Sequence, residues 1–219
     1  MIVTLDGPAG AGKSTAARAL AARLGWCYMD TGAMYRAVAL TALERGVPLD
    51  DGPRVAGLAA RLAIEFRDGR VLADGRDVSA EIRTDRITRA TRPVADAPPV
   101  REALKQVQRR MAACLDVVTE GRDQGSEVFP HADVKVFLTA SATERARRRH
   151  DEELSRGHDS SLETVARELA HRDDGDRTRP VGALKPAADA VLLETDGLSC
   201  EEVVERLVAL VIARGGAAK

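Results

Sequence analysis

The stretch Gly7-Pro8-Ala9-Gly10-Ala11-Gly12-Lys13-Ser14-Thr15 decides the fold of this 219-residue chain. It matches the phosphate-binding loop pattern G-x-x-x-x-G-K-[ST]. The strand-like residues Ile2-Val3-Thr4-Leu5 before it predict a buried strand, and apolar side chains recur after it at helical spacing. These helix-forming residues are Ala17, Leu20, Ala21 and Leu24. Because the pattern requires a strand, a loop and a helix in this order, residues 7–15 are expected to hold the phosphates of a nucleotide.

The residue types in this loop follow from the chemistry of phosphate. Glycines let the backbone wrap closely around a triphosphate with its N–H groups pointing inward. The N-terminus of the following helix adds a favourable partial charge for an anion. Lys13 is expected to bridge the β- and γ-phosphates, and the Ser14 hydroxyl to bind Mg²⁺. All nine residues are therefore candidates for binding ATP, with Lys13 as a candidate catalytic residue and Ser14 as the candidate metal ligand.

A phosphate-binding loop alone does not name a reaction, because GTP-dependent switches, ATPase motors and small-molecule kinases all contain one. The chain has no asparagine, so the Asn-Lys-x-Asp guanine signature of switch GTPases is absent. No long apolar strand ends in Asp-Glu, as it does in motor ATPases. The compact length and the arginine-rich sections favour a kinase, since phosphoryl transfer needs charge stabilisation more than covalent chemistry.

Composition limits the partners of the chain. Hydrophobic residues make up 44% and charged residues 31%, which is ordinary for a globular domain. The net charge of −1 and the 3% of aromatic residues argue against a nucleic-acid polymer or a membrane as partner. No stretch approaches the roughly 20 apolar residues of a membrane helix, and the strand at the start leaves no room for a signal peptide. We therefore expect a cytoplasmic protein, and the modest apolar surface signals favour a monomer.

Cysteines and histidines give no sign of a disulfide or a zinc site. Cys27, Cys114 and Cys200 are odd in number and far apart, which predicts buried or half-exposed thiols in a reducing compartment. The histidines do not have metal-ligand spacing. They are His131, His150, His158 and His171.

The order of predicted elements indicates an α/β fold, with a parallel sheet covered by helices on both faces. Strands are expected at residues 2–5, 117–119, 134–138 and 191–193. Helices are expected at 34–44 and around residues 104–111. Three further helices are predicted to begin at capping boxes, formed by Ser141 with Glu144, Ser160 with Glu163, and Ser199 with Glu202.

The pattern changes between about residues 50 and 99. Asp68-Gly69 and Asp74-Gly75 favour tight turns, which predicts a small antiparallel meander. The meander is expected to end in the region of Pro93, Pro98 and Pro99, where helices do not run on. We interpret residues 50–100 as an inserted subdomain.

Three more segments contain candidate acceptor-binding residues. The first is Asp30-Thr31-Gly32-Ala33-Met34-Tyr35-Arg36, in which Asp30 or Thr31 could cap a helix and Arg36 could reach a phosphate. The second is Glu120-Gly121-Arg122-Asp123-Gln124-Gly125, either a strand end that closely approaches a ligand or a self-contained ion pair in a turn.

The third segment is Arg172-Asp173-Asp174-Gly175-Asp176-Arg177-Thr178-Arg179. Taken alone, a run of charges favours a solvated loop. It follows a predicted helix that is rich in arginine, so the two together could form a cationic lid over ATP. The arginines of that helix are Arg145, Arg147, Arg148 and Arg149.

These segments, in this order, resemble the bacterial cytidylate kinase family of nucleoside monophosphate kinases, over residues 2–210. The resemblance implies a three-layer P-loop kinase fold of residues 1–219, with a parallel central sheet, a nucleoside monophosphate-binding insert at 50–100 and a helical lid at 145–180. It also implies the reaction ATP + CMP (or dCMP) → ADP + CDP (or dCDP), with Mg²⁺, in pyrimidine nucleotide metabolism.

The same resemblance implies roles for matching residues. Arg36, Arg122 and Arg179 would grip the acceptor phosphate and the transferring group, with Arg122 and Arg179 catalytic. Arg101 and Asp123 would read the cytosine, which offers an N4 donor to a carboxylate and acceptors to an arginine. The remaining residues implied to bind CMP are Thr31, Arg172 and Asp176, the last two at the ribose.

Some positions depart from the family pattern. Arg92 lies where a small hydroxyl residue usually helps to bind the base, so it would either clash with cytosine or swing away and leave one hydrogen bond missing. Gln124 and Glu127 stand where apolar residues are common, Gly175 interrupts the charged run, and Gly182-Ala183 replaces a small residue followed by proline. Two alternatives therefore stay open: a kinase for another acceptor such as UMP, and a nucleotide-binding protein without turnover.

Overall fold

The computed structural model describes residues 1–155, 157 and 160–216. The chain divides into two compact units, of which unit 1 comprises Met1–Tyr28 and Asp116–Lys219 and unit 2 comprises Met29–Leu115. Residues 156, 158 and 159, which belong to the predicted lid region 145–180, lie outside the described residues. His158 is one of them.

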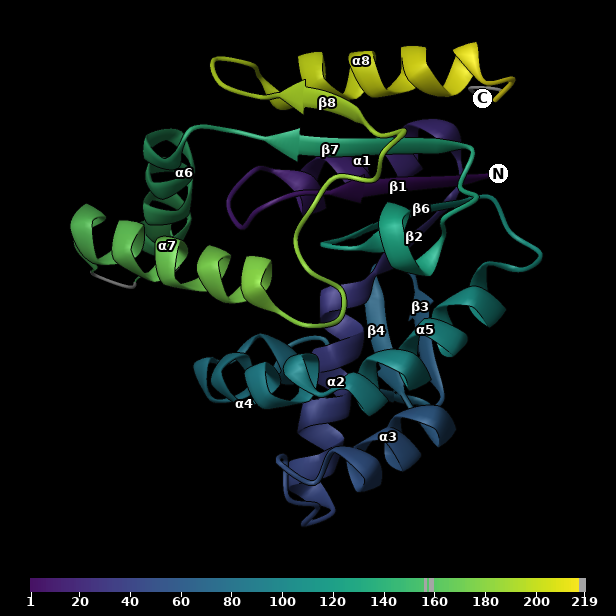
Figure 1. The fold of residues 1–219 in the computed structure, drawn as a ribbon, viewed down its shortest axis with the longest axis vertical. Helices are drawn as coiled ribbons and strands as arrows, with labels where there is room; N and C mark the ends of the chain where they lie inside the picture. The colour runs from purple at the N-terminus through teal and green to yellow at the C-terminus, as the bar shows by residue number, and fades with distance from the viewer. Residues whose placement is uncertain (156, 158–159, 217–219) are drawn as a thin grey trace. The chain divides into compact units, whose positions relative to one another are not determined.

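A parallel sheet forms the centre of unit 1, with the strand order β2-β6-β1-β7-β8 (Figure 1). Its strands are β1 (Ile2–Asp6), β2 (Cys27–Asp30), β6 (Val117–Gly121), β7 (Val134–Thr139) and β8 (Val191–Glu194). The chain passes into unit 2 within β2. Val3 of β1 lies opposite Val118 and Val134 of its two neighbours. Nearly continuous apolar runs of this kind suit strands that are buried on both faces, and the predicted parallel sheet is confirmed.

Two helices pack together against this sheet: α1 (Lys13–Leu24) and α8 (Cys200–Ala213). The apolar residues predicted for α1 are buried, and so are Val204, Leu207, Val208 and Val211 of α8. Ser199 and Glu202 form the predicted capping box at the start of α8. None of the helices in the described part of the chain combines the length and the apolar character needed to cross a membrane.

Two further helices, α6 (Ala142–Ser155) and α7 (Leu162–Thr178), pack together and contact the phosphate-binding loop of the same unit. The box predicted at Ser141 is only half formed. The Ser141 hydroxyl accepts from the Glu144 N–H at 3.2 Å, but the Ser141 N–H donates to Asp196 at 2.9 Å. The Glu144 carboxylate instead binds two arginines of α6, and these bonds lower its pKa to about 2.

The cap of α7 was predicted one residue too early. Ser161, not Ser160, accepts the N–H of Thr164. The Ser160 hydroxyl donates to Glu153 of α6 at 2.5 Å. Ser160 and Ser161 offer the same capping hydroxyl. Because the Ser160 hydroxyl is bound to Glu153, Ser161 caps α7.

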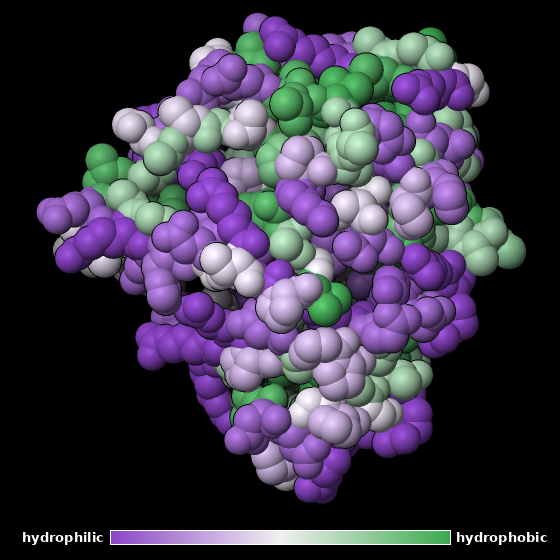
Figure 2. Space-filling view, in the orientation of Figure 1, coloured by the Kyte–Doolittle hydropathy of each residue, from purple (hydrophilic) through white to green (hydrophobic). Residues whose placement is uncertain are grey.

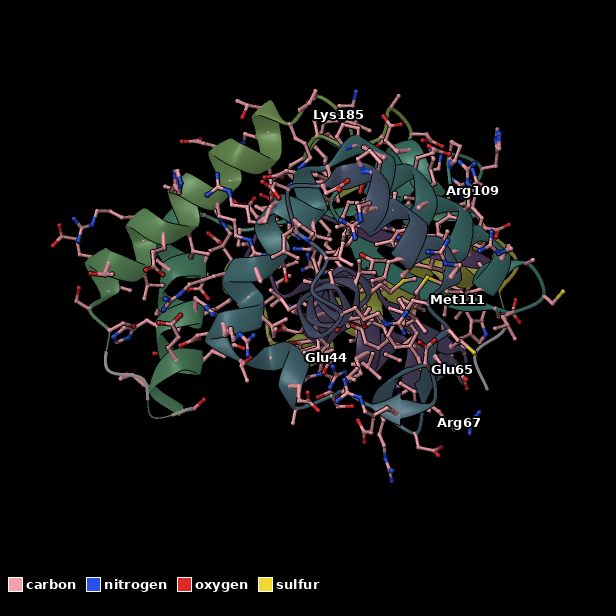
Figure 3. All side chains as sticks on the ribbon, turned by 90° about the horizontal axis from the view of Figure 1, so that it is seen from below. Glu44, Glu65, Arg67, Arg109, Met111 and Lys185 are labelled. Atoms are coloured by element: carbon pink, nitrogen blue, oxygen red, sulfur yellow. The ribbon has the colours of Figure 1, made fainter. Side chains whose placement is uncertain are left out.

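Unit 2 contains the helices α2 (Thr31–Glu44), α3 (Gly52–Arg61), α4 (Asp85–Asp96) and α5 (Pro98–Ala112). Its sheet has the order β3-β4-β5 and is antiparallel, with β3 (Ile64–Arg67), β4 (Arg70–Ala73) and β5 (Arg76–Asp77). The predicted turns connect these strands, and Asp68 and Asp74 adopt positive φ angles of 51° and 48°. Glu65 and Arg67, labelled in Figure 3, leave the same face of β3 and pair at 2.7 Å. The predicted meander is therefore confirmed.

Helices α3 and α4 of unit 2 were not predicted. Helix α4 also contradicts the expectation that helices do not run on in the region of Pro93. Pro93 lies inside α4, although a proline removes one backbone donor and crowds the preceding turn. Ile87 and Val94 of this helix are 2% and 0% exposed, so burial of its apolar face holds the helix together across the proline. Pro98 and Pro99 stand in the first turn of α5, where proline is tolerated.

Exposed apolar and thiol groups lie mainly at the ends and edges of elements. Leu192 of the edge strand β8 and Ile212 of α8 are 65% and 53% exposed, and hydrophobic atoms gather over these two elements in Figure 2. Cys27, Cys114 and Cys200 are all exposed, contrary to the buried or half-exposed prediction. Cys27 and Cys200 are the first residues of their elements and Cys114 follows α5, so each lies where the chain meets solvent.

Candidate active site

The phosphate-binding loop lies between the end of β1 and the start of α1, as predicted. Gly7, Gly10 and Gly12 have φ angles of 145°, 78° and 82°, which L-residues rarely adopt. A Cβ atom added at Gly7 would overlap the carbonyl oxygen of Leu138, and one at Gly10 would lie 3.0 Å from Arg145 Cβ. Glycine is therefore needed here both for backbone conformation and for close approach to β7 and α6.

A cavity of about 430 Å³ opens beside this loop, entirely within unit 1. This size is in the range of ligand pockets. The loop supplies residues 10–15, and α6 supplies two cations and a carboxylate. The other lining residues lie on α1, β7, the β8–α8 connection and α8. The lining from outside the loop consists of Ala16, Leu138, Arg148, Arg149, Glu152, Thr195, Leu198, Cys200 and Val203.

Lys13 is held inside the loop. Its side chain is buried, and Nζ donates to the carbonyl oxygen of Pro8 at 2.6 Å. Burial, together with the positive charges of Arg122 and Arg172, lowers the pKa of Lys13 to about 7 against the attraction of Glu120. A phosphate group would favour the charged ammonium, so the site is prepared for an anion that supplies negative charge.

Ser14 and Glu120 join the loop to the end of β6. The Ser14 hydroxyl donates to Glu120 Oε1 at 3.0 Å, and Glu120 is only 6% exposed. Hydroxyl and carboxylate oxygens are the ligands that Mg²⁺ prefers, so this donor set fits the metal ion predicted at Ser14. The sequence interpretation quoted Glu120 without giving it a role. The signal available was an acidic residue at the end of a strand adjacent to the phosphate-binding strand.

Asp176 of α7 brings two predicted catalytic arginines together. It accepts from Arg122 Nε and from Arg179 Nη2, each at 2.7 Å. Burial alone would raise the pKa of Asp176, but Arg122, Arg179 and Arg172 outweigh it and hold that pKa below its usual value. We call Arg122, Arg172, Asp176 and Arg179 the arginine cluster. The third predicted segment is thus helical through residue 178 and not a loop.

Asp123 and its neighbours are tied to the strand that leads into the phosphate-binding loop. The carboxylate of Asp6, at the end of β1, accepts the N–H groups of Gln124 and Gly125 at 2.8 and 2.7 Å. Burial raises the pKa of Asp6 to about 6 against the effect of these two bonds. A Cβ at Gly125 would lie 2.8 Å from Thr4 Oγ1, so this glycine permits close approach to β1.

Three predicted acceptor residues belong to unit 2. Asp30 caps α2 by accepting the Ala33 N–H at 2.8 Å, so Asp30 is the cap and Thr31 is a buried residue of the first turn. Arg36 Nη2 lies 3.8 Å from Asp30. Arg101 is 7% exposed.

Arg101 lies over an aromatic ring of its own unit. Its guanidinium carbon is 5.7 Å from the centre of the Tyr35 ring, within the range of a cation–π contact. Its Nη1 donates to the carbonyl oxygen of Ala95 at 3.1 Å. These two contacts link α2, α4 and α5 inside unit 2 and fix the direction of the guanidinium.

The residues that depart from the family pattern have definite surroundings. Arg92 is 56% exposed on α4, and its Nε lies 3.8 Å from Asp96, so its side chain follows the helix surface. Gln124 is 2% exposed and accepts from Thr119 Oγ1 at 3.0 Å. Gly175 lies within α7, whose helix continues through it.

A model of the cytidylate kinase family matches residues 3–213. The chain belongs to the cytidylate kinase family. Cytidylate kinase from Rhodopirellula baltica is 47% identical to it over 211 residues, which are 96% of this chain and 92% of that one. Cytidylate kinase from Pelotomaculum thermopropionicum is 47% identical over 216 residues, which are 96% of both chains.

Solved structures show the same fold at low sequence identity. An uncharacterized protein from Eubacterium ventriosum has a TM-score of 0.56 and 10% identity, over 97% of this chain and 98% of that chain. A gluconokinase from Sinorhizobium meliloti has a TM-score of 0.50 and 18% identity, over 98% of this chain and 92% of that chain. The predicted P-loop kinase fold is therefore confirmed for this member of the cytidylate kinase family.

Proposed function

We propose that this member of the cytidylate kinase family transfers the γ-phosphoryl group of ATP to CMP and dCMP, forming CDP and dCDP in pyrimidine nucleotide metabolism. The observation that carries the proposal is the combination, within unit 1, of a phosphate-binding loop with its cavity and the arginine cluster joined by Asp176. Two relatives that are 47% identical over nearly their whole length are named cytidylate kinase, which supports CMP as the acceptor.

The donor end of the site would bind ATP through residues 7–15. Backbone N–H groups of the loop would surround the phosphates, and Lys13 would move from the Pro8 carbonyl to phosphate oxygens. Ser14 and Glu120 would hold Mg²⁺, which supplies charge neutralisation for the phosphates when it is bound. The Ser14 hydroxyl already donates to Glu120 at 3.0 Å, so the two oxygen ligands lie close enough together to bind one ion.

Five of the predicted residues would bind the acceptor. Arg122, Arg179 and Arg36 would grip the acceptor phosphate and the transferring group, and Arg101 and Asp123 would read the cytosine. Each of these groups has the charge its role needs, since a carboxylate accepts the N4 amino group of cytosine and an arginine donates to its N3 and O2.

The ribose would be held by Asp176 with Arg172, and Thr31 would complete the CMP site. Each Asp176 oxygen already accepts from one arginine. A carboxylate offers about four lone-pair positions, so Asp176 can accept ribose hydroxyls without releasing Arg122 or Arg179. The same residue would therefore orient the sugar and the two catalytic arginines.

Catalysis would come from position and charge and not from a covalent intermediate. The arginines and Lys13 would stabilise the negative charge on the transferring group, which is the main requirement of phosphoryl transfer. We further propose that residues 50–100 form the monophosphate-binding insert and residues 145–180 the lid, and that the protein acts as a monomer in the cytoplasm.

The test is ADP release from ATP and Mg²⁺ with CMP, dCMP, UMP and AMP run in parallel. We expect rapid turnover with CMP and dCMP and much slower turnover with UMP, which presents an acceptor where CMP presents the N4 donor. Arg101→Ala and Asp123→Ala should raise the KM for CMP far more than the KM for ATP. Equal rates with all four acceptors would refute the cytosine specificity, and binding of CMP without any ADP release would refute the kinase activity.

A further inference from the structure

One buried ion pair connects the two helices α6 and α7 beneath the phosphate-binding loop. Arg145 Nη1 of α6 lies 2.5 Å from Asp173 Oδ2 of α7, and the two side chains are 9% and 2% exposed. Ala9, Ala146, Val165 and Leu169 form an apolar cluster that brings α6, α7 and the loop together. Removing two charges from water costs several kcal/mol per ion, so a pair at this place needs further polar partners.

Those partners are backbone atoms at the tip of the loop. The N–H of Ala9 donates to Asp173 Oδ1 at 3.3 Å, and Arg145 Nη1 donates to the carbonyl oxygen of Ala9 at 3.0 Å. A Cβ at Gly10 would lie 3.0 Å from both the Cβ and the carbonyl oxygen of Arg145. Both polar backbone groups of Ala9, at the tip of the loop, are thus hydrogen-bonded, and Gly10 packs closely against α6.

The same helix then leads to the arginine cluster. Asp173 lies three residues before Asp176, which is a rise of about 4.5 Å along a helix. Asp176 accepts from Arg122 and Arg179. One turn of α7 therefore separates the carboxylate that binds the loop from the carboxylate that binds the catalytic arginines.

We propose that Arg145 and Asp173 are positioning residues, which hold the donor-phosphate loop in register with the arginine cluster. The inference rests on the proposed kinase function. Neither side chain needs to touch a substrate, because both act through the Ala9 backbone and through α7. A displacement of about 1 Å between reacting groups can cost about 10²-fold in rate, so loss of this register should reduce turnover more than nucleotide binding.

The double variant Arg145→Met with Asp173→Leu distinguishes a loss of loop positioning, measured by kcat, from a loss of stability, measured by the unfolding midpoint. Replacing a buried ion pair by apolar groups of similar volume is often neutral or stabilising, so loss of the charges themselves should not unfold the protein. The Ala9 backbone groups that lose their partners should lower the unfolding midpoint only modestly. The N–H and carbonyl of Ala9 lose their partners, so kcat should fall about 10- to 100-fold, while the KM for ATP changes far less. The matched control removes the exposed pair Arg23–Glu205 as Arg23→Met with Glu205→Leu and should keep wild-type kcat.

The conservative variant Arg145→Lys provides a second readout, which decides the matter if the double variant does not fold. Lysine keeps the positive charge, but its compact ammonium does not reproduce the span of a guanidinium. In the wild type that guanidinium binds Asp173 and the carbonyl oxygens of Ala9 and Ala140. We expect an intermediate loss of kcat. Wild-type kcat in Arg145→Lys, or in a stable double variant, would overturn the proposal.

A third measurement does not depend on the acceptor. ATP with Mg²⁺, added without any monophosphate, should shift the backbone amide resonances of residues 172–179 in the wild type, because the loop transmits its change to α7. The double variant should lose most of that shift while it still binds ATP. A shift that persists unchanged in the double variant would overturn the positioning role. A wild type that shows the shift but does not turn over CMP would refute the proposed function alone.

Discussion

The phosphate-binding loop and the arginine cluster are held in place by different means. Backbone conformation fixes the loop, through three glycines with positive φ and one close approach to Leu138. Buried side-chain charges fix the cluster, through the bonds of Arg122 and Arg179 to Asp176. Atoms added to the loop glycines should therefore reduce stability, and loss of Lys13 should reduce activity. Where a buried carboxylate holds the structure together, stability should depend on its charge and thus on pH.

Lys13→Ala should have the largest effect on activity. Removing a group that stabilises charge in the transition state costs about 10²- to 10³-fold or more in kcat. The fold should remain intact, because Lys13 is a buried cation whose pKa is already lowered to about 7 and whose removal relieves a desolvation cost. Steady-state kinetics together with circular dichroism check both parts. Substantial activity in a folded variant would contradict the role of the loop lysine.

Gly7→Ala should have the largest effect on stability. An alanine there adopts a disfavoured φ of 145° and overlaps the Leu138 carbonyl, so we expect a loss of about 3 kcal/mol or more in the free energy of unfolding. Gly46→Ala is the matched control, since Gly46 also has a positive φ but no atom within 4 Å of an added Cβ. It should lose only about 1 kcal/mol. Urea denaturation compares the two, and equal losses would show that the close approach to β7 is unimportant.

The sequence predicted the phosphate-binding loop but not the hydrogen bonds that connect it and its strand to the rest of the unit, for a physical reason. The loop motif is local, so nine consecutive residues specify glycine conformations, the helix start and the lysine. The bonds from Asp6 to residues 124 and 125, from Ser14 to Glu120, and from Ala9 to Asp173 join residues more than 100 positions apart. No period or spacing in the sequence encodes them. Pro93 within α4 shows the same limit, because burial of Val94 outweighs a local rule.

Asp6 extends the comparison to pH. Its pKa is raised from 3.8 in the unfolded chain to about 6 in the fold, so the native state binds more protons between these values. Its contribution to stability is therefore fully present below about pH 4 and is lost as pH rises through 6. Relative to Asp6→Asn, which does not titrate, the wild type should lose about 2–3 kcal/mol of unfolding free energy between pH 4 and pH 7. Urea denaturation at the two pH values measures this difference.

The control for that experiment is Asp133→Asn. Asp133 accepts the Ile2 N–H through an exposed contact, so this variant makes the same chemical change at a carboxylate that faces solvent. A difference between wild type and Asp6→Asn that stays constant from pH 4 to pH 7 would mean that the Asp6 carboxylate is not desolvated. The Asp6 bonds to residues 124 and 125 would then be as accessible to solvent as those at the surface.

Arg92→Ser should have the smallest effect and bears on the acceptor side. Arg92 is 56% exposed and lies 3.8 Å from Asp96, a surface pair of the kind that contributes about 0–1 kcal/mol. Stability should thus change by less than about 0.5 kcal/mol. If a small hydroxyl at this position can donate to the base, the KM for CMP should fall by up to about tenfold, which is the value of one net hydrogen bond. Arg89→Ser on the same helix is the control and should leave the KM unchanged. A higher KM for CMP in Arg92→Ser would show instead that the arginine itself contributes to acceptor binding, so that its charge would contribute to affinity as proposed for the arginine cluster.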